Sequence, residues 1–246
     1  MRRIRITLSY DGTDYHGWQI QPGLPTIQST IGQALAEIEG APVAVTASGR
    51  TDAGVHALAQ VAAFDLENPI PVDNLRRALN RLLPPDIRIL ETAEAPAGFH
   101  PRHHAVAKTY EYRVFLGEVC PPFERRYTHH HPYPLDVDRI IALAPQLKGE
   151  HDFTAFAASD ARDARGASKV RTIFSSRADR AGDRLVYRVR GSGFLKHMVR
   201  NIMGTLIEAG RGNLDAGGLR AYLTPPFGKA GPTAPACGLF LVCVEY

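Results

Sequence analysis

Residues 49–57 read GRTDAGVHA and place three side chains that can do chemistry within one short stretch: Arg50, Asp52 and His56. An aspartate carboxylate can act as a nucleophile or a general base, and a tight glycine-containing loop can project it into a cleft. Loops on a rigid scaffold often carry catalytic side chains. The same spacing also fits an Asx turn in which Asp52 only caps the loop, so the loop alone leaves both interpretations open.

A second candidate is the segment RGSGFLKHMVRN, residues 190–201. Gly191 and Gly193 allow a tight turn from a strand into a helix. The polar residues that lie off the apolar stripe of this helix are Lys196, His197, Arg200 and Asn201. They form either a solvated helix face or a functional one, in which Arg200 pairs with a carboxylate and keeps it ionised while its neighbours meet phosphate.

The third candidate is the alternating segment AKTYEYRV, residues 107–114, which carries Lys108, Tyr110 and Tyr112. Paired aromatic side chains in strands usually belong to the core. A tyrosine at the lip of a cleft can instead stack on a base or exchange a proton. The pattern predicts the strand but does not choose between these roles.

Metal and cofactor chemistry finds no support in the sequence. Histidines gather at residues 100–104 and 129–131, but neither group has the i, i+4 helical pairing and nearby glutamate of a zinc protease. The glycine-rich motifs of nucleotide binding and the GxSxG motif of serine hydrolases are lacking. We therefore expect no metal and no cofactor. Three cysteines without CxxC spacing predict free thiols in a reducing compartment, the cytoplasm.

The candidate segments alternate with elements of clear periodicity. Residues 3–10 alternate apolar and polar side chains, which predicts a half-buried strand. Two helices are expected at 26–40 and 73–82, with Thr26 and Asp73 as N-caps. Further strands are expected at 43–48, 58–66, 109–115, 172–177, 185–190 and 238–246, and further helices at 136–149 and 195–210.

This order repeats strand, helix, paired strands and helix, which predicts an α+β fold of two similar lobes, residues 1–104 and 105–246. The first lobe holds nine Lys and Arg against eleven Asp and Glu, and the second holds twenty against fourteen. This asymmetry fits a nucleic-acid-binding face as well as a chance distribution of surface charge. No segment approaches the roughly 18 consecutive apolar residues of a membrane span. Residues 157–169 predict a solvated loop or a flap that touches RNA.

Six ordered blocks together closely resemble the tRNA pseudouridine synthase A family. They run nearly from one end of the sequence to the other: LSYDGTDYHGWQIQP, GRTDAGVHA, FHPRHHAVAKTYEYRV, FTAFA with a later VRTI, GSGFLKHMVRN and APACGLFLV. The resemblance implies two α+β lobes around a continuous, mainly antiparallel sheet with a central cleft. It also implies a homodimer without a nucleotide cofactor that acts on uridines 38, 39 and 40 in the anticodon stem-loop of tRNA.

The family's catalytic residues can be carried over by motif. The resemblance implies that Asp52 is the nucleophile, that Tyr110 stacks on the substrate or transfers a proton, and that Arg200 pairs with Asp52. The arginine of the catalytic loop falls on Arg50. Lys196 and His197, from the polar helix face, complete the residues expected at RNA. The sequence departs from the family in its first helix and in residues 157–169, neither of which carries the chemistry.

Pseudouridine formation explains these residue types, because an ionised carboxylate can attack or stabilise the ribose carbon or deprotonate the sugar in a glycal route. The sequence does not separate these routes. The main alternative is a non-catalytic tRNA-binding or chaperone protein that keeps the same scaffold. Another is an RNA nuclease that uses the histidine-rich segments with Lys108.

Overall fold

The computed structural model describes residues 1–159 and 166–246, so the middle of the predicted loop 157–169 lies outside the described residues. The chain forms two compact units. One comprises Met1–Val106 together with Phe240–Tyr246, and the other comprises Ala107–Leu239. The predicted division after residue 104 lies close to the first boundary. It differs at the end of the chain, where the last residues join the first unit.

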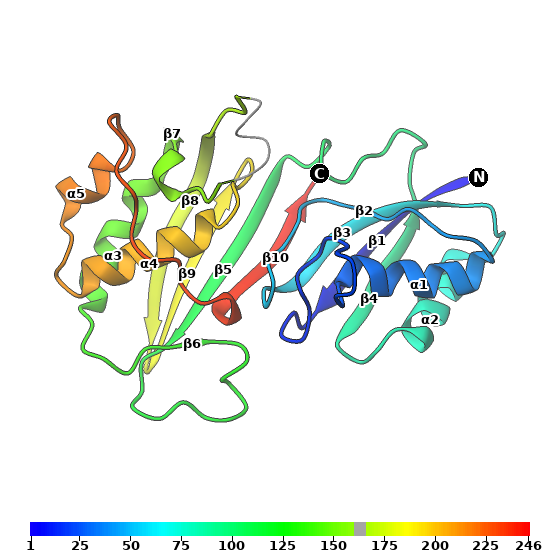
Figure 1. The fold of residues 1–246 in the computed structure, drawn as a ribbon, viewed down its shortest axis with the longest axis horizontal. Coiled ribbons are helices and arrows are strands. Elements are labelled where there is room, and N and C mark those ends of the chain that lie inside the picture. The colour runs from blue at the N-terminus through cyan, green and yellow to red at the C-terminus, as the bar shows by residue number, and fades with distance from the viewer. Residues whose placement is uncertain (160–165) are drawn as a thin grey trace. The chain divides into compact units, whose positions relative to one another are not determined.

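The first unit contains an antiparallel sheet of three long strands (Figure 1). The central strand β1 (Arg2–Tyr10) pairs with β3 (His56–Leu66) on one side and β4 (Ile87–Glu94) on the other. The short β2 (Thr46–Ala47) pairs with β3, and β10 (Leu239–Glu245) runs parallel to the start of β3 with Phe240 opposite His56.

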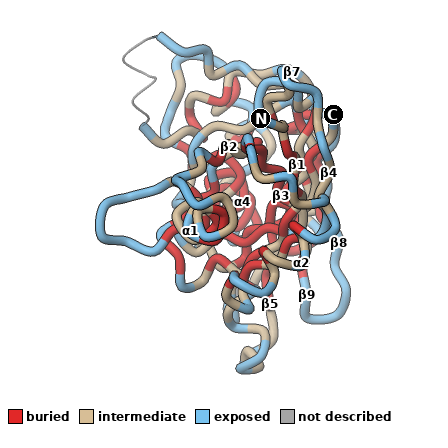
Figure 2. Tube along the Cα trace, turned by 90° about the vertical axis from the view of Figure 1, so that its right-hand side faces the viewer, coloured by how far each residue is buried: buried red, intermediate tan, exposed pale blue. Residues whose placement is uncertain are grey.

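The alternation predicted for the first strand is confirmed. Ile4, Ile6, Leu8 and Tyr10 are all buried, whereas the residues between them are partly exposed. Helix α1 (Ile27–Glu39) and helix α2 (Val72–Leu82) accompany this sheet (Figure 1). The buried faces of strands and helices form the core that Figure 2 shows in red.

Helix α1 begins and ends as its sequence predicts. The Thr26 side chain accepts a hydrogen bond from the Ser29 backbone, and the Ser29 hydroxyl accepts one from the Thr26 backbone. This reciprocal capping box satisfies backbone donors that a helix leaves unpaired. Gly40 closes the helix in the left-handed conformation, with φ of 79°.

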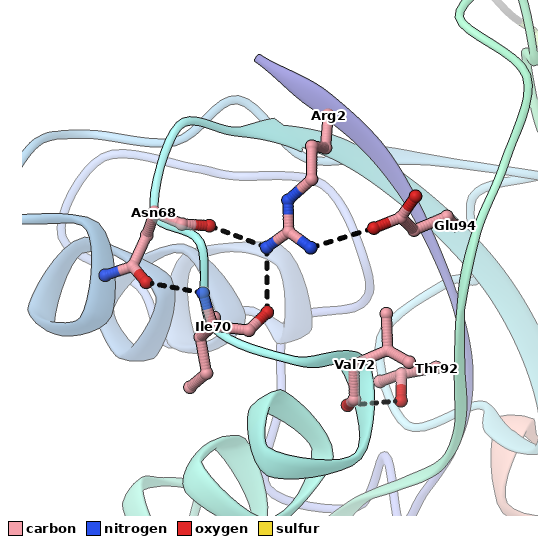
Figure 3. Close-up of polar contacts among 6 residues, drawn as sticks. All are labelled: Arg2, Asn68, Ile70, Val72, Thr92 and Glu94. Carbon is pink, nitrogen blue, oxygen red and sulfur yellow. Dashed lines mark hydrogen bonds and ion pairs between the residues drawn. The ribbon is translucent and has the colours of Figure 1, made fainter.

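Helix α2 begins earlier than predicted. Its N-cap is Pro71, which makes no side-chain cap bond, and Asp73 lies inside the first turn. There its negative charge still favours the positive end of the helix dipole. The connection before the helix is held by Arg2, whose guanidinium donates to the carbonyls of Asn68 and Ile70 and contacts Glu94 at 2.8 Å (Figure 3).

The strands of the second unit pair antiparallel in the order β5 (Ala107–Phe115), β9 (Arg184–Gly191), β8 (Val170–Ala181) and β7 (Gly149–Asp152). A two-residue strand, β6 (His129–His130), runs parallel to the end of β5. The hairpin between β8 and β9 turns at Gly182 in an exposed stretch of chain (Figure 2). The predicted strands at 109–115, 172–177 and 185–190 are confirmed and extend further than expected.

Helix α4 (Met198–Gly210) is the most deeply buried helix segment of this unit and packs beside α3 (Val137–Leu143). Asp136 caps α3, as predicted, but the helix ends six residues before Gly149. It passes into the 3₁₀ helix η1 (Ala144–Leu147), because Pro145 lacks the backbone N–H that an α-helix needs.

Several short elements complete the second unit. They are the 3₁₀ helices η2 (Thr154–Phe156) and η4 (Ala236–Gly238) and the helix α5 (Ala216–Ala221). The fold is therefore α+β with mainly antiparallel strands, as predicted. Among the described residues, no helix is both long and apolar enough to cross a membrane.

Candidate active site

The loop that carries Asp52 lies in the first unit, between β2 and β3. Asp52 is half-buried and Arg50 is exposed. The loop is shorter than predicted, because β3 already begins at His56. His56 is only 1% exposed, so its ring belongs to the support of the loop and not to the surface beside Asp52.

A second segment, residues 11–18, holds the backbone of this loop from one side. The Trp18 N–H donates to the Thr51 carbonyl at 3.0 Å, and the Gly54 N–H donates to the Tyr15 carbonyl at 3.3 Å. These bonds lie on either side of Asp52 in the sequence. They therefore restrict the backbone from which the carboxylate projects.

Two glycines let the backbones of the two segments approach each other. A Cβ at Gly12 would lie 2.0 Å from the Val55 carbonyl oxygen, and one at Gly17 would lie 2.5 Å from the Thr51 carbonyl oxygen. Gly17 also has a φ of +82°, which side-chain-bearing residues rarely adopt. Only glycine satisfies both requirements at position 17.

The His56 ring joins the two segments at the start of β3. Its Nδ1 accepts a hydrogen bond from the Gly12 N–H at 3.1 Å and lies 3.1 Å from an Asp11 carboxylate oxygen. The ring also stacks on Phe240 with centroids 4.7 Å apart. The imidazole therefore fixes the end of β1 relative to the end of the loop that carries Asp52.

Side-chain hydrogen bonds complete the support. The Tyr10 hydroxyl pairs with the Thr51 hydroxyl at 2.8 Å, and the Gln60 amide donates to the Gly49 carbonyl at 3.0 Å. Burial raises the pKa of Tyr10 to about 12, although hydrogen bonds to Thr51 and Gln60 lower it. Tyr10 therefore stays a neutral phenol and supports the loop without adding charge beside Asp52.

In the second unit, Tyr110 lies on β5 and is 8% exposed. Its ring meets the edge of Phe194, with centroids 4.9 Å apart and planes at 75°. Phe194 belongs to the segment between β9 and α4 and was not singled out from the sequence. Edge-to-face contact with a second aromatic ring fixes the orientation of the Tyr110 ring.

Arg200 is held by the segment that follows α5. Its Nε donates to the Ala234 carbonyl at 2.8 Å, and the Ala234 N–H donates back to the Arg200 carbonyl at 3.2 Å. This pair uses the Nε side of the guanidinium and fixes the direction of the side chain. Arg200 itself is partly exposed.

The predicted polar face of this helix is wrong for Asn201, which is 8% exposed. Its amide donates to the Phe156 carbonyl at 2.7 Å, and its carbonyl oxygen accepts from the Thr233 hydroxyl at 2.6 Å. A buried amide with both ends paired explains a polar residue within an apolar helix. Its role is to attach residues 231–234 next to Arg200.

Lys196 and His197 precede the helix, which begins at Met198 and not near residue 195. The Lys196 ammonium is exposed and donates to the Ser159 carbonyl at 3.4 Å. His197 is the N-cap and has a φ of 61°, so the left-handed residue of this turn is His197 and neither Gly191 nor Gly193. Gly191 is needed for another reason, since a Cβ there would lie 2.9 Å from the Thr172 carbonyl oxygen.

Neither histidine-rich stretch forms a metal-binding cluster among the described residues. Within residues 1–159 and 166–246, no three His, Cys, Asp or Glu side chains are grouped so that they could hold a metal ion. Burial, together with His131 and His130, lowers the pKa of His129 to about 4, so this ring is neutral. Cys120, Cys237 and Cys243 are free thiols.

The structure thus groups the predicted residues within each unit. Arg50 and Asp52 share one loop, and Tyr110, Lys196, His197 and Arg200 surround the β5 and α4 region of the other unit. Sequence reasoning missed Gly17, Trp18, Phe194 and Thr233, which position these side chains. For the first two the only signal was the glycine-punctuated block DGTDYHGW, to which no role could be given.

A loop-borne aspartate on one α+β unit and a tyrosine and arginine on a second are consistent with the class of enzymes that isomerise nucleosides within RNA. The model of the family described as tRNA pseudouridine synthase matches residues 6–103 and 143–246. The chain belongs to this family.

Full-length relatives agree. A protein named tRNA pseudouridine synthase A from Solibacter usitatus (strain Ellin6076) is 68% identical over 246 residues, which cover 100% of both chains. A protein of the same name from Halalkalibacterium halodurans is 46% identical, and the match covers 97% of this chain and 90% of the relative. The one from Latilactobacillus sakei subsp. sakei (strain 23K) is 44% identical, with coverage of 100% and 99%.

We predict that Gly17→Ala displaces the catalytic loop, since the added methyl group would lie 2.5 Å from the Thr51 carbonyl oxygen. A misplacement of about 1 Å at a reacting group can slow a reaction about a hundredfold. The initial rate of pseudouridine formation in tRNA, measured with enzyme that remains folded by circular dichroism, checks this.

Gly23→Ala is the matched control, because Gly23 also has a positive φ, of +73°, but a Cβ there meets nothing within 4 Å. Both variants incur the cost of a left-handed non-glycine residue, about 1–2 kcal/mol. Only Gly17→Ala should lose rate beyond that common effect. Equal rates for the two variants would contradict the proposed support of the loop.

Proposed function

We propose that this protein converts uridine into pseudouridine in tRNA, with Asp52 as the carboxylate that acts on the ribose. The observation that carries the assignment is the fixed backbone around Asp52. This half-buried carboxylate lies on a loop whose backbone is bonded to residues 11–18 both before and after Asp52 in the sequence. A loop that only capped a turn would not need this support. The family membership of the chain supplies the reaction class.

The reaction is an isomerisation. The bond from ribose C1′ to uracil N1 breaks, the uracil turns while it stays bound, and C1′ joins C5. The proton on C5 leaves and N1 gains one, so atoms and electrons balance without an oxidant or an added group. The protein must therefore supply a group that acts on the sugar, a site that retains the free uracil and a path for one proton.

Asp52 can meet the first requirement in two ways. Its ionised carboxylate can attack or stabilise C1′, or it can deprotonate the sugar and open a glycal route. Either route requires the nucleotide to leave its stack, which costs a few kcal/mol. A carboxylate held in advance by a rigid loop avoids an additional ordering cost at that moment.

We assign to Tyr110 the contact with the extruded base. Its ring is fixed edge-on to Phe194, so a pre-oriented aromatic face can replace the stacking that the base loses. Its hydroxyl is the group that could move the C5 proton. Burial of the ring to 8% exposure suits a site from which water is largely excluded.

We assign to Arg200 the pairing with Asp52 during the reaction. The hydrogen bond from the Arg200 Nε to the Ala234 carbonyl orients the guanidinium. The backbone at Ala234 thus also sets the direction of the other guanidinium N–H groups. A positive charge beside a carboxylate favours the ionised form, which is the reactive one. Arg50, Lys196 and His197 would contact the RNA around the reacting nucleotide.

The resemblance to the family favours uridines 38, 39 and 40 of the anticodon stem-loop as targets and a homodimer as the active form. Free thiols at all three cysteines are consistent with a reducing compartment, and we place the enzyme in the cytoplasm. The competing function is a tRNA-binding or chaperone protein without catalysis. It would bind tRNA and release no tritium from tRNA labelled at uridine C5.

Asp52→Asn keeps the size of the side chain and removes its charge. We expect turnover to fall by more than about a thousandfold, the scale on which loss of a nucleophile acts. Tritium release from tRNA labelled at uridine C5 measures turnover, and filter binding should find nearly unchanged affinity for tRNA. Asp73→Asn, at an exposed position in α2, is the control. Near-normal turnover by Asp52→Asn would show that Asp52 is not the carboxylate that acts on the ribose.

Tyr110→Phe keeps the ring against Phe194 and deletes the hydroxyl. If the hydroxyl moves the proton, we expect binding to persist while product formation falls about a hundredfold or more, the usual scale of general acid–base catalysis. Quench-flow measurement of one turnover separates the two steps. Normal product formation would restrict Tyr110 to stacking.

Arg200→Gln removes the charge proposed to favour ionised Asp52. We expect the acid limb of the pH–rate profile to move to higher pH by about 1–3 units, since a nearby opposite charge acts on that scale. Activity measured from pH 4 to pH 9 in constant ionic strength checks the shift. A limb that stays in place would refute the ion pair.

A further inference from the structure

The turn that follows β4, residues 96–104, is rich in basic side chains and has no assigned role. Its sequence, PAGFHPRHH, contains Arg102 and three histidines, and residues 95–106 contain no Asp or Glu. Arg102, His103 and His104 are exposed.

The turn is attached to the first unit at three points. The Arg3 Nε donates to the Phe99 carbonyl at 3.1 Å, and the Tyr246 hydroxyl donates to the Pro101 carbonyl at 2.8 Å. The Phe99 ring also packs on Tyr246, with centroids 5.2 Å apart. The exposed basic side chains therefore stand on a backbone that is already fixed, so binding a partner does not have to order this backbone.

Hydrogen bonds inside the turn decide which way the histidine donors face. The His100 Nδ1 accepts from the backbone N–H groups of Arg102, at 3.1 Å, and His103, at 3.3 Å. The His104 Nδ1 accepts from the His100 N–H at 3.4 Å. In both rings Nδ1 is thus an acceptor, so the proton sits on Nε2 and is directed away from the turn's own backbone.

The turn itself contains no carboxylate that could pair with its basic side chains. On the neighbouring strand β3, the Asp65 carboxylate is engaged by Arg3 at 2.9 Å. Partial burial, followed by the charges of His103 and Arg3, lowers the pKa of His100. The turn therefore presents the Arg102 guanidinium and histidine N–H donors, a set that matches phosphate oxygens.

We infer that residues 100–104 form a phosphate-binding surface for tRNA outside the catalytic site. The inference rests on the proposed function, which makes RNA the polyanion that this protein meets. The turn is fixed to β1 at Arg3, whereas the catalytic loop is fixed at Tyr10. Arg3 and Tyr10 are seven positions apart along the extended strand β1, which corresponds to about 23 Å.

That separation determines what the surface can do. Contacts so far from the reacting ribose form equally in the bound substrate and in the transition state. Such uniform binding lowers KM and leaves kcat unchanged. Because phosphate contacts release counterions, the surface also contributes to the salt dependence of binding.

The test is the double variant Arg102→Ala with His103→Ala, which retains the backbone bonds of the turn. We expect KM for tRNA to rise about fivefold to tenfold in 0.15 M salt, with kcat within a factor of two of the wild type. The slope of log affinity against log salt should become shallower by about 1. Arg81→Ala, an exposed arginine at the end of α2, is the control for general charge.

An unchanged KM and salt slope would overturn the inference, and so would an equal change in Arg81→Ala. If sedimentation shows that the double variant alters the oligomeric state while affinity for tRNA stays normal, the turn binds a second copy of the chain and the inference is also wrong. Wild-type enzyme that forms no pseudouridine would instead refute the proposed function. The two failures are therefore distinguishable.

Discussion

The loop that carries Asp52 depends on one constraint, the direct approach of two backbones without side chains between them. Gly12 and Gly17 lie where any Cβ would collide with the carbonyls of Val55 and Thr51. Hydrogen bonds from Trp18 and to Tyr15 then link the two backbones on either side of Asp52. Backbone contact of this kind is stiffer than contact through long side chains, since no rotamer can change to relax it.

The second unit uses the same principle around Arg200. A Cβ at Gly204 would lie 1.7 Å from the Pro232 carbonyl oxygen, so residues 231–234 run directly against helix α4. The buried pair of Asn201 and Thr233 and the two-way bond between Arg200 and Ala234 fix this approach. In each unit a candidate site residue, Asp52 or Arg200, is therefore positioned by a segment far from it in the sequence.

Local patterns predicted the elements but not these long-range contacts. The strand at β1 and both ends of α1 followed from alternation and capping, because those signals are complete within a few residues. Asp52, Tyr110 and Arg200 could each be singled out as candidates from local patterns, but their expected roles came from the resemblance to the family. The burial of Asn201 could not be predicted, since its partners Phe156 and Thr233 lie 45 and 32 residues away. The early end of α3 could have been expected from Pro145.

The strand β10 belongs to the first unit, although it is the last strand of the chain to be synthesised. Phe240 pairs with the start of β3 and stacks on His56, yet it follows the rest of the first unit by more than a hundred residues. A ribosome delivers residues 1–106 long before it delivers this strand. The nascent first unit therefore lacks the ring that covers His56, and the support of the Asp52 loop is completed only after the whole second unit has been made.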